Sequence, residues 1–155
     1  MTLINYNIAV AICFESPQVF KQEVLATTLQ TLVELPKIPN LTMRTAIQAI
    51  QTHRGLQTFM NSILVRLISR KVWTEPKIWQ GFVLCCQSLQ PSCYPVLLTM
   101  EPNSLRDFLT VCSRNERRRD GGSSIKTGLK KYISSVGDRE KSKCRLLDGK
   151  TGIEY

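Results

Sequence analysis

The fold of this chain is decided by residues 43–82, which read MRTAIQAIQTHRGLQTFMNSILVRLISRKVWTEPKIWQGF. Apolar residues recur in this stretch at the spacing that places them on one face of an α-helix. They are Met43, Ile47, Ile50, Leu56, Met60, Ile63, Leu67, Ile78 and Phe82, continued by Cys86. Breaks at 53–55 and 74–76 divide the pattern, so it predicts consecutive helices joined by short turns.

Proline, glycine and serine residues mark further helix ends before and after this stretch. The predicted helices form antiparallel pairs, because short loops force sequential helices to pack side by side. Their bounds are 17–35 with 41–52, 55–71 with 76–89, and 92–99 with 103–112. Shorter helices are expected at 2–14 and at 125–136, the latter with Leu129, Tyr132, Ile133 and Val136 on one side. The predicted fold is all-α: stacked helical hairpins forming a HEAT- or armadillo-like segment of a right-handed α-solenoid, followed by a flexible basic tail.

The first long helix has a clear predicted start. Ser16 is expected at its N-cap and Pro17 in its first turn. Arg70 and Lys71 are expected in the last turn of the helix 55–71, where cations favour the helix dipole. The helix 17–35 also carries two apolar faces, which favours a place inside a layered stack; one face holds Leu25, Leu29, Leu32 and Val33, and the other Phe20 and Val24.

Composition indicates one globular domain with a basic end. The chain has 155 residues, of which 43% are hydrophobic, and a formal net charge of +9. Residues 1–112 hold nine Lys or Arg and six Asp or Glu, whereas residues 113–155 hold twelve and six. No apolar run approaches the ~20 residues of a membrane span, and we expect no signal peptide.

The chemistry-bearing residues do not form a recognisable reaction centre. His53 is the only histidine, and the sequence contains no Cys-x-x-Cys pair for zinc. Without a secretion signal, the six cysteines are expected to be reduced thiols buried as small apolar groups. We therefore expect no catalytic residues, no cofactor, no metal and no small-molecule substrate, and a chain built to present helix faces for binding.

Four segments of the chain combine rare residues in a specific order: MRTAIQAI (43–50), ILVRLISRKVW (63–73), PKIWQGFVLCCQ (76–87) and QPSCYPVLL (90–98). Together they resemble one known family, the C-terminal domain of symplekin. The resemblance covers roughly residues 8–112, and from Glu116 onward the sequence departs from the family pattern. It implies a helical domain at 1–112 and a largely disordered or divergent basic tail at 113–155.

The resemblance also implies a function. Symplekin is the scaffold of the eukaryotic pre-mRNA 3′-end processing machinery. Its C-terminal domain docks the metallo-β-lactamase endonuclease subunit and that subunit's inactive paralogue, alongside other cleavage-factor subunits. The expectation is a non-catalytic scaffold of the mRNA cleavage and polyadenylation complex in the nucleus, with the catalytic zinc in the partner.

Five residues are candidates for partner binding: Arg44, Trp73, Lys77, Trp79 and Phe82. Trp73 and Trp79 either line one groove or join two adjacent helices in the core, where tryptophan is usually found. Arg44 lies early in a helix, against the dipole, so we expect an internal ion pair with Glu34 or Glu75, or an acidic partner.

Two other classes of function stay open. The basic tail favours an RNA-binding helical module with weak, salt-dependent contact to RNA. Arg117–Arg119 and Lys130–Lys131 loosely resemble a bipartite nuclear import signal. A generic helical adaptor outside 3′-end processing is the second alternative, and the sequence does not choose the helix face that would bind a partner.

Overall fold

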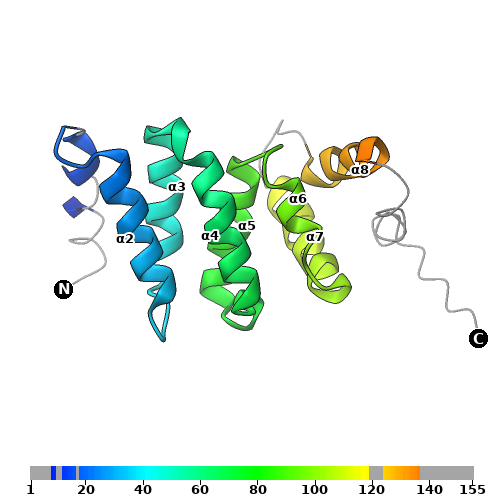
Figure 1. The fold of residues 1–155 in the computed structure, drawn as a ribbon. Coiled ribbons are helices and arrows are strands. Elements are labelled where there is room, and N and C mark those ends of the chain that lie inside the picture. The colour runs from blue at the N-terminus through cyan, green and yellow to red at the C-terminus, as the bar shows by residue number, and fades with distance from the viewer. Residues whose placement is uncertain (1–7, 10–11, 17, 119–123, 137–155) are drawn as a thin grey trace, which may run out of the picture. The chain divides into compact units, whose positions relative to one another are not determined.

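The computed structural model describes residues 8–9, 12–16, 18–118 and 124–136. These residues form helices and turns without a strand, which confirms the predicted all-α, repeat-like fold (Figure 1). Of the predicted helix at 2–14, residues 1–7 and 10–11 lie outside the described part, and residues 8–9 and 12–15 are helical. The chain divides into two compact units, Met1–Cys85 and Cys86–Tyr155.

The first unit contains helices α2 to α4 and most of α5. Their bounds are α2 Gln22–Glu34, α3 Thr42–Thr52, α4 Gln57–Ser69 and α5 Pro76–Ser88, with 3₁₀ turns η1 Arg54–Leu56 and η2 Val72–Thr74. In Figure 1, α2 and α4 lie side by side in one layer, and α3 and α5 lie behind them. The predicted helices at 41–52 and 76–89 are thus confirmed within one residue at each end.

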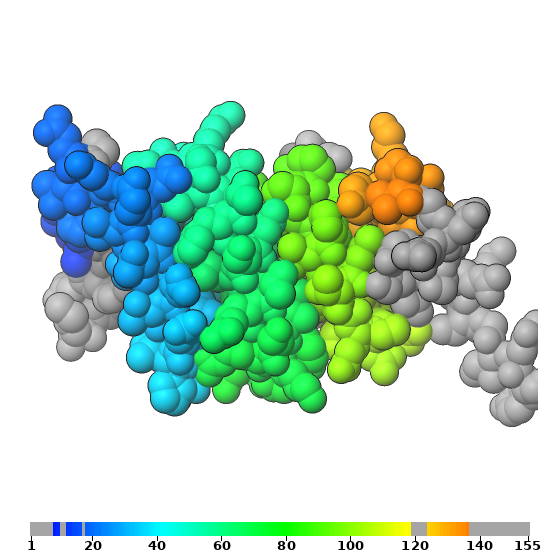
Figure 2. Space-filling view, viewed as in Figure 1, coloured from blue at the N-terminus to red at the C-terminus, as the bar shows by residue number. Residues whose placement is uncertain are grey.

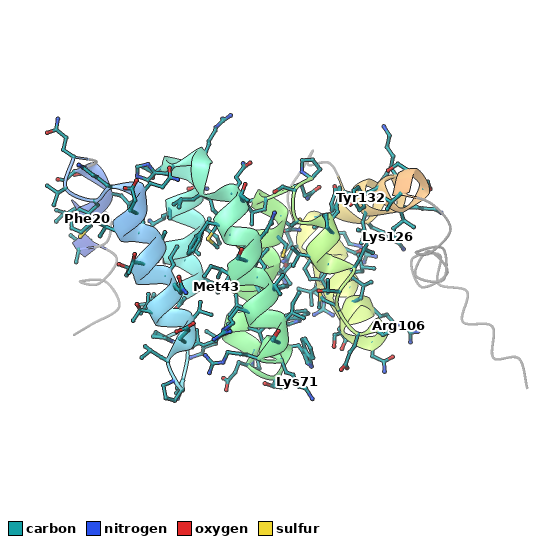
Figure 3. The ribbon with its side chains drawn as sticks, viewed as in Figure 1. Phe20, Met43, Lys71, Arg106, Lys126 and Tyr132 are labelled. Atoms are coloured by element: carbon teal, nitrogen blue, oxygen red, sulfur yellow. The ribbon has the colours of Figure 1, made fainter. Side chains whose placement is uncertain are left out.

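The core of this unit is the predicted apolar stripe. Met43, Ile50, Leu56, Met60 and Leu67 are buried. Met43 lies among the packed helices in Figure 3, and it meets α5 at Gly81. A Cβ atom added to Gly81 would lie only 2.4 Å from Met43 Cβ, so α3 and α5 pack closely there because residue 81 has no side chain.

The predicted start of the first long helix is wrong. The carbonyl of Ser16 accepts hydrogen bonds from the backbone N–H groups of Val19 and Phe20, which closes a separate turn. Lys21 then has extended backbone (φ −65°, ψ 159°), and α2 begins only at Gln22. The predicted second apolar face is also wrong for Val24, which is 46% exposed, since α2 buries one face made of Leu25, Leu29 and Val33.

The helix predicted at 55–71 is shorter. It is preceded by η1, and α4 ends at Ser69 because Lys71 takes the left-handed conformation (φ 53°, ψ 51°). Arg70 and Lys71 therefore follow the helix rather than form its last turn.

The second unit contains α6 Tyr94–Leu97, α7 Pro102–Glu116 and α8 Ile125–Val136. The helix predicted at 92–99 is reduced to one turn followed by turn hydrogen bonds, and the helix predicted at 103–112 continues to Glu116. The predicted helix 125–136 is confirmed. It buries Ile125, Leu129 and Ile133, with Tyr132 half-buried, but Val136, which we placed on this face, is 53% exposed.

The cysteines that the structure describes are reduced thiols outside any disulfide, as expected. Cys85, Cys86, Cys93 and Cys112 are buried and Cys13 is half-buried, whereas Cys144 lies outside the described residues. The Cys93 thiol donates a hydrogen bond to the carbonyl of Cys86 near the end of α5 (3.2 Å). The thiols of the second unit therefore pack as small core groups.

Candidate protein-binding surface

The two tryptophans meet where η2 leads into α5. Their ring centroids lie 6.5 Å apart in an edge-to-face arrangement, with planes at 77°. Trp79 also stacks on Phe82 at 5.4 Å with planes at 12°. The turn that joins the rings is held by the backbone N–H of Trp79, which donates to the carbonyl of Glu75 (2.8 Å). The structure thus brings three of the five candidate residues into one aromatic cluster.

Burial separates the members of this cluster. Phe82 is fully buried. Trp79 is 8% exposed, so it has the core position that was the alternative for the tryptophans. Trp73 is only half-buried and retains a face toward solvent. Arg44 on α3 and Lys77 on α5 are exposed. A partner that binds this unit in its folded form can contact Arg44, Trp73 and Lys77, with Trp79 and Phe82 as the support beneath Trp73.

The expected internal ion pair of Arg44 does not form. Glu34 instead pairs with Arg66 across α2 and α4, with Nη2 to Oε1 at 3.1 Å. Both side chains of this pair are about half exposed, so the pair is worth only a few tenths of a kcal/mol, to about 1 kcal/mol. The side chain of Arg44 makes no hydrogen bond or ion pair with the residues that the structure describes, so its guanidinium is available to a partner.

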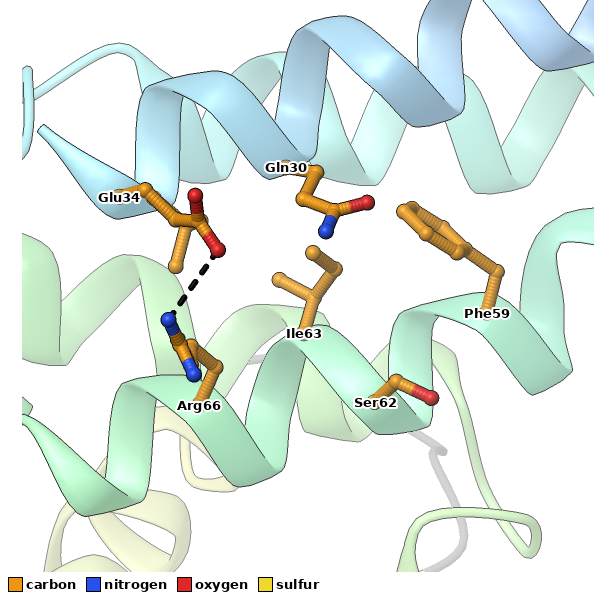
Figure 4. A pocket seen from close by; sticks show the side chains of 7 residues that line it. Gln30, Glu34, Phe59, Ser62, Ile63 and Arg66 are labelled. Atoms are coloured by element: carbon orange, nitrogen blue, oxygen red, sulfur yellow. Dashed lines mark hydrogen bonds and ion pairs between the residues drawn. The ribbon is translucent and has the colours of Figure 1, made fainter.

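A groove between α2 and α4 is a second candidate surface. Its cavity volume is about 220 Å³, and it is lined by Gln30, Val33, Glu34, Phe59, Ser62, Ile63 and Arg66. Figure 4 shows Gln30 and Glu34 reaching from α2 toward Phe59, Ile63 and Arg66 on α4. Figure 2 shows the face on which the side chains of these two helices meet. An adjoining hollow of about 450 Å³ extends from Glu34 and Arg66 to Ser69 and Arg70.

Sequence reasoning missed this groove. One signal was present: Phe59 lies one position before Met60, at the edge of the apolar stripe, and remains half-buried. Gln30 and Ser62 carried no signal, because their role depends on how α2 and α4 are placed side by side.

Arg70 joins the ends of α2 and α4 below this groove. Its guanidinium donates to the carbonyls of Val33, Leu35 (2.7 Å) and Pro36 (2.9 Å). These carbonyls belong to the last turn of α2 and the residues after it, where a helix leaves acceptors without intrahelical partners. Arg70 therefore caps a neighbouring helix, and three of its five N–H donors are used within the protein.

Two ionisable groups of the second unit, Tyr94 and Cys112, have raised pKa values. Burial raises the pKa of Tyr94 above its usual value, with a smaller contribution from Cys93. Burial, then Glu116 and Cys93, raise the pKa of the Cys112 thiol far above its ordinary range. A thiol held in its protonated form is a poor nucleophile.

These two shifts predict a loss of stability in alkali. Between the ordinary pKa values, 9.0 for cysteine and 10.0 for tyrosine, and the raised ones, the unfolded chain releases protons that the folded chain keeps. The free energy of unfolding should therefore fall as the pH rises above about 9, by about 1.4 kcal/mol per pH unit for each linked proton. Urea unfolding at a series of pH values between 8 and about 10.5 measures this slope. Cys112→Ala should flatten this slope; a slope equal to that of the wild type would exclude Cys112 as a source.

The described residues hold no group of three or more His, Cys, Asp or Glu placed to bind a metal ion. None of the helices in the described ranges combines the length and hydropathy needed to cross a bilayer.

Comparison with known proteins gives one family. The family model described as "Symplekin tight junction protein C terminal" matches residues 2–112, which include α2 to α6 and most of α7. No solved structure gives a significant match to the chain.

Proposed function

This chain belongs to the symplekin C-terminal family, and from that membership we propose that it is a non-catalytic scaffold of the nuclear mRNA cleavage and polyadenylation complex. Family membership itself suggests a scaffold role in mRNA 3′-end processing. The finer proposal is that the domain docks the metallo-β-lactamase endonuclease subunit and its inactive paralogue. The match over residues 2–112 is the observation that carries the proposal.

We further propose that Arg44, Trp73 and Lys77 contact the partner. An aromatic side chain resting on a packed cluster loses little conformational freedom on binding, which is typical of interface hot spots. Arg44 on α3 and Lys77 on α5 are exposed cations of the same unit and would favour an acidic patch on the partner. Trp79 and Phe82 contribute by holding Trp73 in place, since both rings are buried.

Co-purification with the two nuclease-like subunits tests this proposal. The tagged full chain should retain both subunits, and the triple variant Arg44→Glu/Trp73→Ala/Lys77→Glu should retain at least about tenfold less, since each lost hot-spot contact costs about 1–2 kcal/mol. Trp79→Ala is less informative, because its burial links binding to folding. The matched comparison is a groove variant, Gln30→Arg/Ser62→Arg, at two exposed positions.

Each outcome has one meaning. Failure of the wild-type chain to retain either subunit would overturn the docking role. Full retention by the triple variant would show that Arg44, Trp73 and Lys77 are not the contact. Loss in the groove variant alone would place the contact between α2 and α4. A generic adaptor would retain other proteins in place of the two nuclease-like subunits.

A further inference from the structure

The described residues beyond the family match are rich in exposed cations. Between residue 113 and Val136 the structure describes six exposed Lys or Arg and one acidic residue, Glu116. Three of the cations follow Cys112 at the end of α7 and three lie on α8. We name them the cationic face; its members are Arg114, Arg117, Arg118, Lys126, Lys130 and Lys131.

A hydrogen bond holds the two groups of cations close together. The backbone N–H of Ile125, the first residue of α8, donates to Glu116 Oε1 at the last residue of α7 (2.9 Å). Arg117 and Lys126 are the sequence neighbours of this bonded pair, and consecutive Cα atoms are only about 3.8 Å apart. The same bond fixes the only described carboxylate in this segment between the two groups, so its single negative charge stands against six positive charges.

The solvent side of α8 carries no apolar anchor before its last residue. Its exposed positions are three lysines and three hydroxyl residues, followed by Val136. The hydroxyls of Ser134 and Ser135 donate to carbonyls of the helix itself, so the exposed positive charge of this side comes from the lysines. The apolar side is already used, because Ile125, Leu129 and Ile133 are buried and the ring of Tyr132 lies 5.7 Å from that of Tyr94. Figure 3 labels Lys126 and Tyr132 on this helix.

These features favour one class of anionic partner over a membrane surface or an acidic protein. A membrane-surface helix needs a free apolar face to enter the bilayer, and α8 has buried its own. A protein partner is usually held by a desolvated aromatic or apolar anchor, which the cationic face lacks. A phosphate backbone needs only closely spaced Lys and Arg donors. We propose that the cationic face binds the phosphate backbone of a nucleic acid without sequence preference.

This inference is independent of the docking role proposed above. It concerns residues outside the family match, and it adds a nucleic-acid contact to a domain whose family suggests a protein scaffold. With about four phosphates neutralised, the slope of log affinity against log salt should be about −3. Affinity should then fall about 50-fold between about 50 and 200 mM salt.

The test is binding of a fluorescent 20-nucleotide oligouridine to the full chain, followed by anisotropy at several salt concentrations. The variant Lys126→Glu/Lys130→Glu/Lys131→Glu should lose at least about tenfold in affinity and show a shallower salt slope. The control Lys21→Glu/Lys37→Glu/Arg54→Glu makes the same change in net charge at three exposed positions of the first unit, and it should bind within about twofold of the wild type. Circular dichroism should show both variants to be folded.

Three results would overturn the proposal. Equal losses of affinity in the two variants would show that binding depends on net charge alone and not on the cationic face. Wild-type binding that does not depend on salt would exclude a phosphate-backbone contact. Competition by poly-glutamate as effective as unlabelled oligouridine at equal charge would assign the face to acidic proteins instead of a nucleic acid.

Discussion

Replacing Gly81 by alanine is expected to lower the free energy of unfolding by about 2 kcal/mol, the usual cost of overpacking a core. The new methyl carbon would lie 2.4 Å from Met43 Cβ, an atom fixed to the backbone of α3 that cannot rotate away. The helices α3 and α5 would have to separate. Helix propensity alone predicts the opposite sign, because alanine in the middle of a helix is favoured over glycine by about 1 kcal/mol.

Gly55→Ala is the matched control for this prediction. There the nearest atom to an added Cβ is Gln22 Oε1 at 2.8 Å, the end of a flexible side chain that can move. Its free energy of unfolding should change by no more than about 0.5 kcal/mol. Urea unfolding of both variants measures the difference. A neutral or stabilising effect of Gly81→Ala would show that α3 and α5 do not approach each other closely at Met43.

Arg70→Ala should lower the free energy of unfolding of the first unit by about 2–4 kcal/mol. Each hydrogen bond from a charged donor contributes about 1.5–3 kcal/mol, but water can replace part of the lost bonding at the exposed carbonyls. The substitution leaves the carbonyls of Val33, Leu35 and Pro36 without their donor. It also separates the ends of α2 and α4. Arg70→Lys keeps the charge but cannot reproduce the planar fork, so an intermediate loss is expected.

Arg66→Ala provides the comparison, since Arg66 lies in the last turn of α4, just before Arg70, and also faces α2. Its ion pair with Glu34 is about half exposed on both sides, so we expect a loss of about 0–1 kcal/mol. Thermal unfolding of the three variants ranks them. Similar losses for Arg66→Ala and Arg70→Ala would mean that general charge, and not the capping of α2, is the source of the stability.

The sequence predicted those features that depend on local spacing. Helices α3 and α5 follow from apolar periodicity and from the turn chemistry at Pro36–Pro39 and at Glu75–Pro76, which acts within a few residues. The contact between Trp73 and Trp79 follows in the same way, because only one turn separates them.

Features that depend on distant parts of the chain were not predictable. One wrong prediction is local instead: the start of α2 was misplaced because Ser16 closes its own turn, a choice that cap statistics do not resolve. Arg70 was predicted to interact with the dipole of the helix it follows in the sequence. Its hydrogen-bond acceptors instead lie more than thirty residues away in sequence. The groove at Phe59 exists only once α2 and α4 lie together. Disorder of the remaining tail, residues 137–155, stays a prediction, since these residues lie outside the described part.

The helix that contains Cys112 does not stop where the family match stops. It continues to Glu116, whose carboxylate accepts a hydrogen bond from the first backbone N–H of α8, and α8 then buries three aliphatic side chains of its own. A recombinant fragment that ends with the match would cut through the last turn of α7 and leave out α8. The end of the family match is therefore a poor choice for the end of an expressed domain.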